Sequence, residues 1–127
     1  MGGRHSRNKG KRFEREVADR MRALFPEAAA SIKRGWQSRA GHDAADVEGV
    51  PYLWIEAKAH RVAPLRPALT QAIEARDAAK STKLPVAICK SDREAPVVVM
   101  LLEDFEALVI ALRGDRLAHF VEVGQSQ

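Results

Sequence analysis

The chain has 127 residues, of which 46% are hydrophobic and 30% are charged, and these proportions suit one globular domain with a single core. Its longest apolar stretches, residues 95–102 and 107–112, are far shorter than the roughly 20 residues that a membrane helix needs. The first residues lack the apolar segment of a secretory signal, and the lone Cys89 cannot build a disulfide framework. We therefore expect a cytoplasmic protein without a membrane span.

The formal net charge is +4, and the positive charge is concentrated at the start of the chain. Five basic residues precede the first acidic one: Arg4, Arg7, Lys9, Lys11 and Arg12. This run predicts a flexible basic arm over residues 1–9. Such an arm binds polyanions by releasing condensed counterions, so nucleic acid is the first partner to expect, although a merely solubilising tail fits the charge equally well.

The first half of the chain predicts one helix and three strands. Phe13, Val17, Met21, Leu24 and Phe25 recur at helical spacing and predict a helix over residues 9–25, ending before Pro26. Residues 28–34 are expected to be extended, and a polar loop follows. Residues 45–48 and the alternating segment 52–59 then predict two paired strands around a turn at residues 49–51.

The second half predicts a helix, a hairpin and a last helix. Pro67 suits the first turn of a helix that reaches about residue 80. The apolar runs 84–90 and 97–102 predict a hairpin, and residues 105–113 a helix capped by Glu103 or Asp104. The expected fold is a single α/β domain over residues 10–123, with a mixed central sheet flanked by helices and a frayed tail at 124–127.

Glu14 stands out among the acidic residues of the first helix. On a helical wheel it lies about 100° from Phe13, inside the apolar stripe, whereas Glu16 lies on the polar face between Arg12 and Arg20. A carboxylate that faces the core needs a metal ion or a cation from elsewhere in the chain. The alternative is that Glu14 reaches solvent at the start of the helix or pairs with a lysine.

Asp46, Glu56 and Lys58 are expected to share one face of the paired strands. Alternation places Glu56 and Lys58 side by side, and a turn centred on Pro51 places Asp46 opposite Glu56, about 5 Å away. Two carboxylates this close repel one another unless a cation lies between them, and Mg²⁺ prefers such oxygen ligands. The alternative is an exposed hairpin in which Glu56 pairs with Lys58.

A metal beside a lysine suits phosphodiester hydrolysis. The ion neutralises developing charge and lowers the pKa of a bound water, while Lys58 orients that water, helps to take its proton or stabilises the phosphate. The pattern leaves these three roles of Lys58 open.

These residues resemble the PD-(D/E)xK nuclease superfamily, written here as Ala45-Asp46 and Glu56-Ala57-Lys58. The segment from Gly10 to Val17 is similar to the opening of archaeal-type Holliday junction resolvases and related phage enzymes, in which a glycine precedes the helical metal-site glutamate by four positions. The resemblance covers residues 10–102 and implies a restriction-endonuclease-like core, with Glu14, Asp46 and Glu56 holding Mg²⁺, or Mn²⁺ in its place. Gln71 looks like the polar residue that these nucleases place near the metal.

The sequence therefore predicts a structure-specific DNA endonuclease, and a four-way junction is the favoured substrate. The alternatives are a general nicking or flap nuclease and a non-catalytic nucleic-acid-binding module with the same fold. Because a junction must be cut at two symmetric positions, we expect a homodimer. The residues expected to contact DNA are Arg4, Arg7, Lys9, Lys11, Arg12, Arg34, Trp36, Arg39 and His60.

Overall fold

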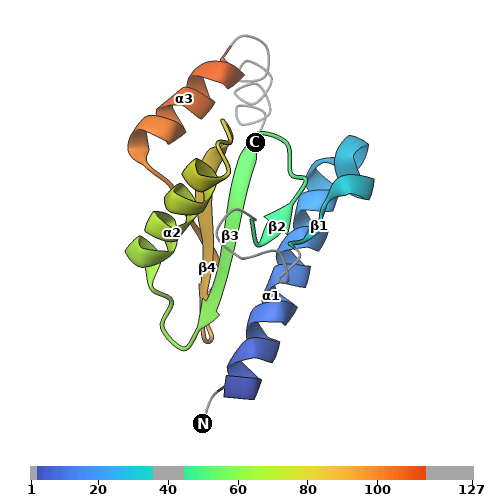
Figure 1. The fold of residues 1–127 in the computed structure, drawn as a ribbon, viewed down its shortest axis with the longest axis vertical. Coiled ribbons are helices and arrows are strands. Elements are labelled where there is room, and N and C mark those ends of the chain that lie inside the picture. Colours follow the sequence, from blue (N-terminus) through green and yellow to red (C-terminus); the bar gives the residue numbers. More distant parts are fainter. Residues whose placement is uncertain (1–2, 36–44, 114–127) are drawn as a thin grey trace, which may run out of the picture.

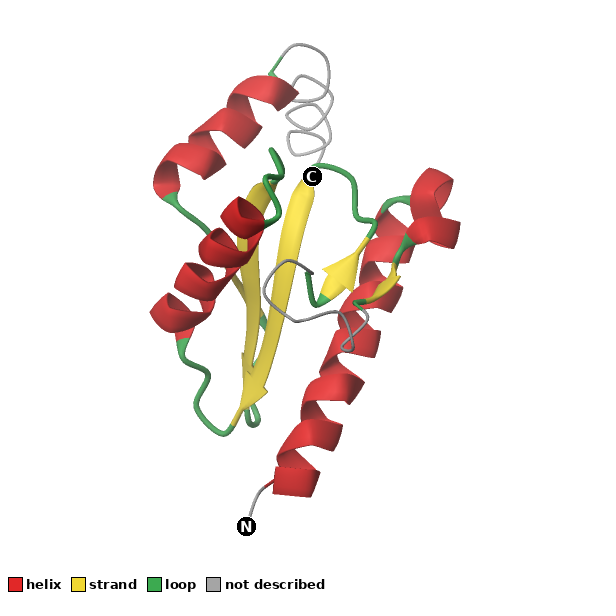
Figure 2. Cartoon of the chain, viewed as in Figure 1, coloured by secondary structure: helices red, strands yellow, loops and turns green. Residues whose placement is uncertain are grey.

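A computed structural model describes residues 3–35 and 45–113 of the chain. Its elements follow in the order α1 (Gly3–Leu24), the 3₁₀ helix η1 (Pro26–Ser31), β1 (Lys33–Arg34), β2 (Val47–Glu48), β3 (Leu53–His60), α2 (Leu65–Ala78), β4 (Leu84–Ser91), β5 (Val97–Val99) and α3 (Leu102–Leu112). Figures 1 and 2 show this arrangement, with α1 and α2 on either side of the long strands β3 and β4. The predicted order of helix, three strands, helix, two strands and helix is confirmed.

Within the described ranges, five strands form one mixed sheet in the order β1-β2-β3-β4-β5. Only β3 and β4 are parallel; the other neighbouring strands are antiparallel. The helix α2 makes the crossover that a parallel pair requires. The predicted mixed sheet flanked by helices is therefore confirmed, as are the pairing of β2 with β3 and the hairpin of β4 with β5.

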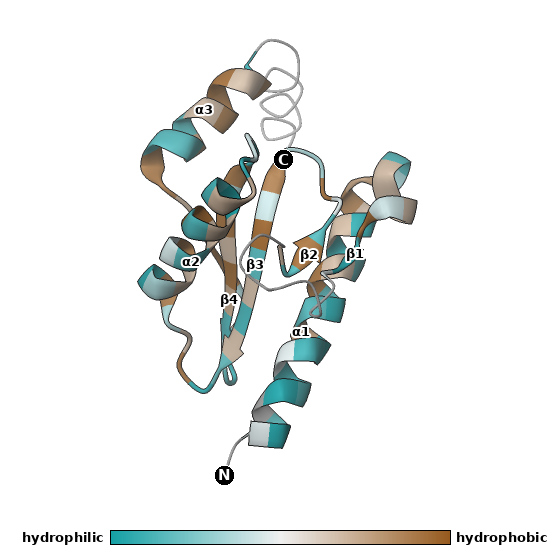
Figure 3. Cartoon of the chain, in the orientation of Figure 1, coloured by the Kyte–Doolittle hydropathy of each residue, from teal (hydrophilic) through white to brown (hydrophobic). Residues whose placement is uncertain are grey.

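The sheet separates two apolar layers because its side chains alternate between the faces. On one face, Ile55 and Ala57 of β3 pack with Phe13 and Val17 of α1. On the other face, Trp54 packs with Ala72 and Ala75 of α2. Figure 3 shows brown, hydrophobic segments along β3 and β4 interrupted by teal, hydrophilic ones, and largely teal N-terminal turns of α1.

The helix α1 begins at Gly3, six residues before the expected start, so the segment expected to be a flexible arm is helical from Gly3 onwards. Core packing starts at Phe13, which is 4% exposed. Residues 4–9 contain no proline, so the helix extends towards the N-terminus ahead of the packed turns. The apolar pattern marked the packed part of the helix and not its beginning.

Two other local predictions were wrong. Residues 28–31 were expected to be extended, but they belong to η1, because Pro26 occupies its first turn and three alanines follow that favour helical backbone. The helix α3 begins at Leu102, and its N-cap residue Leu101 makes no side-chain hydrogen bond. Glu103 and Asp104 lie in the first turn, where they interact favourably with the helix dipole and do not act as caps.

None of the helices in the described ranges combines the length and the apolar character that crossing a membrane requires. Trp36 and Arg39 of the predicted DNA-contacting set lie outside the described residues, as does the tail expected at 124–127.

Candidate active site

The pairing of β2 with β3 places Asp46 and Glu56 together. Val47 pairs with Ile55, which makes Asp46 the residue opposite Glu56, as the turn at Pro51 predicted. The backbone N–H of Asp46 donates to the carbonyl oxygen of Ile55 at 3.0 Å. The Oδ2 atom of Asp46 accepts a hydrogen bond from the backbone N–H of Ala57 at 3.0 Å. These two bonds hold the Asp46 side chain against β3.

Glu56 is the one charged residue among those buried in the described part of the chain, with a relative exposure of 2%. Burial, a side-chain hydrogen bond with Asp46 and the charge of Asp46 together raise the pKa of Glu56 to about 9. The ammonium of Lys58 and the indole of Trp54 act in the opposite direction. At neutral pH the two carboxyl groups are therefore expected to share a proton when no metal ion lies between them.

Glu14 approaches Asp46 from α1. Its side chain is only 12% exposed, so it faces the core side of the helix as the wheel predicted, whereas Glu16 is exposed. Burial and the charge of Asp46 raise the pKa of Glu14, while Arg34 and Lys58 lower it. Glu14, Asp46, Glu56 and Lys58 thus interact electrostatically, although they come from three elements.

Arg34 on β1 neutralises Glu14, which the sequence did not indicate. Its Nε donates to Oε1 of Glu14 at 3.0 Å, and its side chain is 25% exposed. The next residue, Gly35, donates its backbone N–H to the carbonyl oxygen of Asp46 at 2.7 Å. A Cβ at Gly35 would collide with the backbone of Ala45, so only glycine allows this close approach. Gly35 therefore places Arg34 beside the carboxylates.

Trp54 is a second neighbour of the site that sequence reasoning missed. Its indole is packed against α2 and lies close enough to Glu56 to lower the pKa of that carboxyl. Strand alternation already places Trp54 on the face of Glu56 and Lys58, so the signal was present in the sequence. Gln71 is exposed on α2, and its side chain makes no hydrogen bond with the carboxylates within the described residues.

The residues expected to contact DNA have several environments. Arg4, Arg7, Lys11 and Arg12 are exposed on α1, and His60 is exposed at the end of β3. Arg34 pairs with Glu14, and Lys9 pairs with Asp92 at 2.8 Å. The exposed cations therefore lie mainly along the first three turns of α1, whereas Arg34 and Lys9 form ion pairs with carboxylates of the same chain.

The donor set suits a hard cation. Asp46 and Glu56 present oxygens from neighbouring strands, and Mg²⁺ usually binds through one or two carboxylates together with water and substrate phosphate. In the described part of the chain, no three Asp, Glu, His or Cys side chains converge as they would around an ion. Glu14 is the third candidate ligand, and it is paired with Arg34 instead. The residues fit Mg²⁺ if Arg34 releases Glu14.

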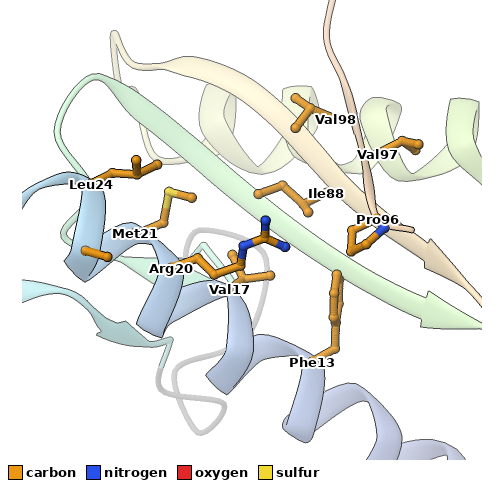
Figure 4. Close-up of a pocket in the computed structure, with 10 residues that line it drawn as sticks. Phe13, Val17, Arg20, Met21, Leu24, Ile88, Pro96, Val97 and Val98 are labelled. Carbon is orange, nitrogen blue, oxygen red and sulfur yellow. The ribbon is translucent and has the colours of Figure 1, made fainter. Parts of the chain in front are cut away.

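A separate apolar groove of about 380 Å³ lies between α1 and the hairpin of β4 and β5. Figure 4 shows Phe13, Met21 and Leu24 of α1 on one side and Val98 on the other, with the guanidinium of Arg20 between them. Arg20 is the one titratable group among the lining residues. The groove therefore lacks the carboxylates of the candidate site and provides no general acid or base.

Comparisons of the chain with protein-family models, with curated proteins and with solved structures found no match.

Proposed function

We propose that the chain is a Mg²⁺-dependent, structure-specific DNA endonuclease with a restriction-endonuclease-like fold, and that a four-way junction is its favoured substrate. The observation that carries this proposal is the contact of the buried Glu56 on β3 with the half-buried Asp46 just before β2, with Lys58 and Glu14 beside it. Burying two carboxylates in contact is unfavourable unless they share a proton or a cation, and such a cost is typical of functional sites. Glu14, Asp46, Glu56 and Lys58 support the proposal because three carboxylates and a lysine are the groups that metal-dependent phosphodiester hydrolysis would use, whereas Gln71 lies apart from them.

Each side chain has a role in the proposed reaction. Asp46 and Glu56 would hold the ion from the sheet, and Glu14 would add a third carboxylate from α1. When bound, Mg²⁺ supplies charge that stabilises the transition state and lowers the pKa of a coordinated water. Lys58, two residues after Glu56 on β3, orients the attacking water, takes its proton or stabilises the phosphate. Arg34, once released from Glu14, would provide a cation for the phosphate.

One observation favours the non-catalytic alternative, a nucleic-acid-binding module with this fold. The Arg34–Glu14 ion pair and the contact of Asp46 with Glu56 satisfy all three carboxylates without a metal ion. Titration calorimetry with MgCl₂ or MnCl₂ in the absence of DNA separates the two functions. A nuclease should give saturable heat that the substitution Glu56→Gln abolishes. A binding module should give only the heat of dilution, and this heat should be the same for the parent and for Glu56→Gln.

The activity itself is tested with four DNA substrates of the same sequence: a four-way junction, a flap, a linear duplex and a single strand. Each is incubated with Mg²⁺ and, in parallel, with a chelator. We expect metal-dependent cleavage that is fastest on the junction. Cleavage of the flap or the duplex at the same rate would support a general nuclease, and no cleavage of any substrate would overturn the proposal.

A further inference from the structure

A hollow of about 270 Å³ lies where α1 passes the carboxyl ends of β3 and β4. Three cations line it: Lys9 and Arg12 from α1 and Lys90 from β4. Its other lining residues are Phe13, Ala59 and the two carboxylates Glu16 and Asp92. In open α/β sheets, ligands commonly bind beside the carboxyl ends of parallel strands, and β3 and β4 are the parallel pair of this sheet.

The sheet register brings Lys90 to this place. Lys90 pairs with Ala59, so it lies on the α1 face of the sheet, whereas the preceding pair, Lys58 with Cys89, lies on the α2 face. Lys90 is half-buried, and its Nζ donates only to the neighbouring carbonyl oxygen of Ser91, at 3.4 Å. In the described part of the chain, its ammonium makes no ion pair. Lys90 therefore retains donors for an anion in the hollow.

Asp92 forms an ion pair with one of the three cations, Lys9. Its Oδ1 lies 2.8 Å from Nζ of Lys9, 83 residues away in sequence, and the hydrogen bond from Lys9 lowers the pKa of Asp92. Lys9 is 28% exposed and Asp92 48%, so water and an incoming anion reach both groups. An exposed carboxylate that pairs with a lysine competes with any other anion for that lysine.

We propose that Lys9, Arg12 and Lys90 bind a backbone phosphate of DNA, and that Asp92 holds Lys9 in the free protein and is displaced when DNA binds. With Asp92 displaced, the lining has three cations against the single carboxylate of Glu16. Lys9 lies about 7.5 Å along the helix axis from Glu14, and Arg12 about 3 Å, given a rise of 1.5 Å per residue. Around the helix, however, Arg12 and Glu16 lie on the side of α1 away from Glu14, so the hollow is a phosphate contact separate from the candidate active site. This inference rests on the proposed function for the identity of DNA as the ligand.

The experiment measures binding of fluorescent duplex and four-way junction DNA in the presence of a chelator, over a range of salt concentrations. Lys9→Gln and Lys90→Gln should each weaken binding to both DNAs and lower the slope of log affinity against log salt by roughly one. Asp92→Asn should strengthen binding, because Lys9 no longer has an internal competitor. Arg113→Gln is the control: it also removes one positive charge, but from the exposed C-cap residue of α3, and the C-terminal end of α3 lies far from the N-terminal turns of α1 (Figure 1).

Two results would overturn the proposal. One is a Lys90→Gln affinity and salt slope equal to those of Arg113→Gln, and the other is an Asp92→Asn affinity no higher than that of the parent. Thermal unfolding of each variant shows whether a loss of binding reflects a loss of fold. The two proposals can fail independently. If the chain cuts no DNA but Lys90→Gln lowers its DNA affinity, the nuclease proposal fails and the phosphate site stands. If the chain cuts DNA and Lys90→Gln leaves the affinity unchanged, the phosphate site fails and the nuclease proposal stands.

Discussion

At the scale of single residues, the candidate site is defined by how each carboxylate is neutralised. Burial and the neighbouring Asp46 raise the pKa of Glu56, so this pair is expected to share a proton, whereas Glu14 pairs with Arg34 and Glu16 is exposed. Glu56 is buried and the Glu14–Arg34 pair is partly buried, and both arrangements use carboxylates that a metal ion would require. Binding of Mg²⁺ therefore has to displace a proton and an arginine, so we expect metal affinity to depend on pH.

Glu14 and Glu16 provide a matched pair of substitutions. Glu14→Gln keeps an acceptor for the Nε of Arg34 but removes a charge that a metal needs, so cleavage should fall by orders of magnitude while folding and junction binding persist. Glu16→Gln removes an exposed charge, for which helix pairs contribute about 0.3–0.5 kcal/mol, and should leave the rate almost unchanged. Single-turnover cleavage and thermal unfolding are the measurements.

Two outcomes would contradict this assignment. If Glu14 has only a structural role, Glu14→Gln should lower the unfolding temperature and leave the metal-dependent rate near that of the parent. Equal losses of rate from both substitutions would remove the support that the orientation of Glu14 gives to the site.

The protonated Glu56 predicts a pH dependence of stability in the metal-free protein. Its pKa is about 9 in the folded chain against 4.5 for the ordinary group, so between these values the folded state binds more protons than the unfolded state. The stabilisation is complete below about pH 4.5 and is lost as the pH rises through 9. Urea unfolding in a chelator should therefore give a free energy of unfolding that falls from pH 5 to pH 9.

Glu56→Gln is the control for this titration, because an amide cannot lose the proton. Its free energy of unfolding should vary less over the same pH range. Mg²⁺ or Mn²⁺ should stabilise the parent most at high pH, where the proton is easiest to displace. A parent protein whose stability rises steadily from pH 5 to pH 9 without metal would show that Glu56 is ionised in the fold.

At the scale of elements, the helix α1 has three roles. Its middle turns pack Phe13 and Val17 on the sheet, Glu14 joins the carboxylates, and its first turns carry exposed basic residues. Core packing begins at Phe13, so the turns before it contribute little buried area. Substitutions in these turns should therefore leave the core packing intact.

Deletion of residues 1–8 tests the basic turns. The deletion removes Arg4 and Arg7 but keeps Lys9, Phe13 and Glu14, so the chain should fold and bind metal as the parent does. DNA affinity should fall, and its dependence on salt should become flatter, because fewer counterions are released. Salt titrations of junction binding, with circular dichroism to confirm the fold, are the measurement. An unchanged salt slope would show that these turns do not contact phosphate.

The sequence predicted the periodic features of these elements and missed those that depend on tertiary contact. Alternation in β3 and the turn at Pro51 were enough to place Asp46 opposite Glu56, because register follows from turn geometry and side-chain period. The Arg34–Glu14 and Lys9–Asp92 pairs join residues 20 and 83 positions apart, and neither has a local pattern. The early start of α1 was missed because exposed turns carry no apolar period.

At the scale of the whole molecule, the fold brings one set of candidate catalytic residues to one place. Glu14 comes from α1, Asp46 from the residue before β2, and Glu56 from β3, so the set lies towards the β1 side of the sheet. The residues that the structure describes hold one such set, so we expect a second set to come from a second chain. Resolution of a four-way junction requires two cuts related by symmetry, so the number of chains decides between a resolvase and an enzyme that cuts one strand.

We therefore expect a two-fold symmetric homodimer at the concentrations at which a junction is resolved, because cyclic dimers are the commonest soluble oligomers and supply two equivalent sites. Sedimentation equilibrium should give twice the chain mass for the free protein, and two chains for each junction in the complex. Both cuts should then occur within the lifetime of one complex, which a cruciform plasmid reports as a direct passage from supercoiled to linear DNA. A monomer in both the free and the bound state, with nicked circles accumulating first, would contradict the resolvase assignment while leaving a single-strand nicking nuclease with the same carboxylate site.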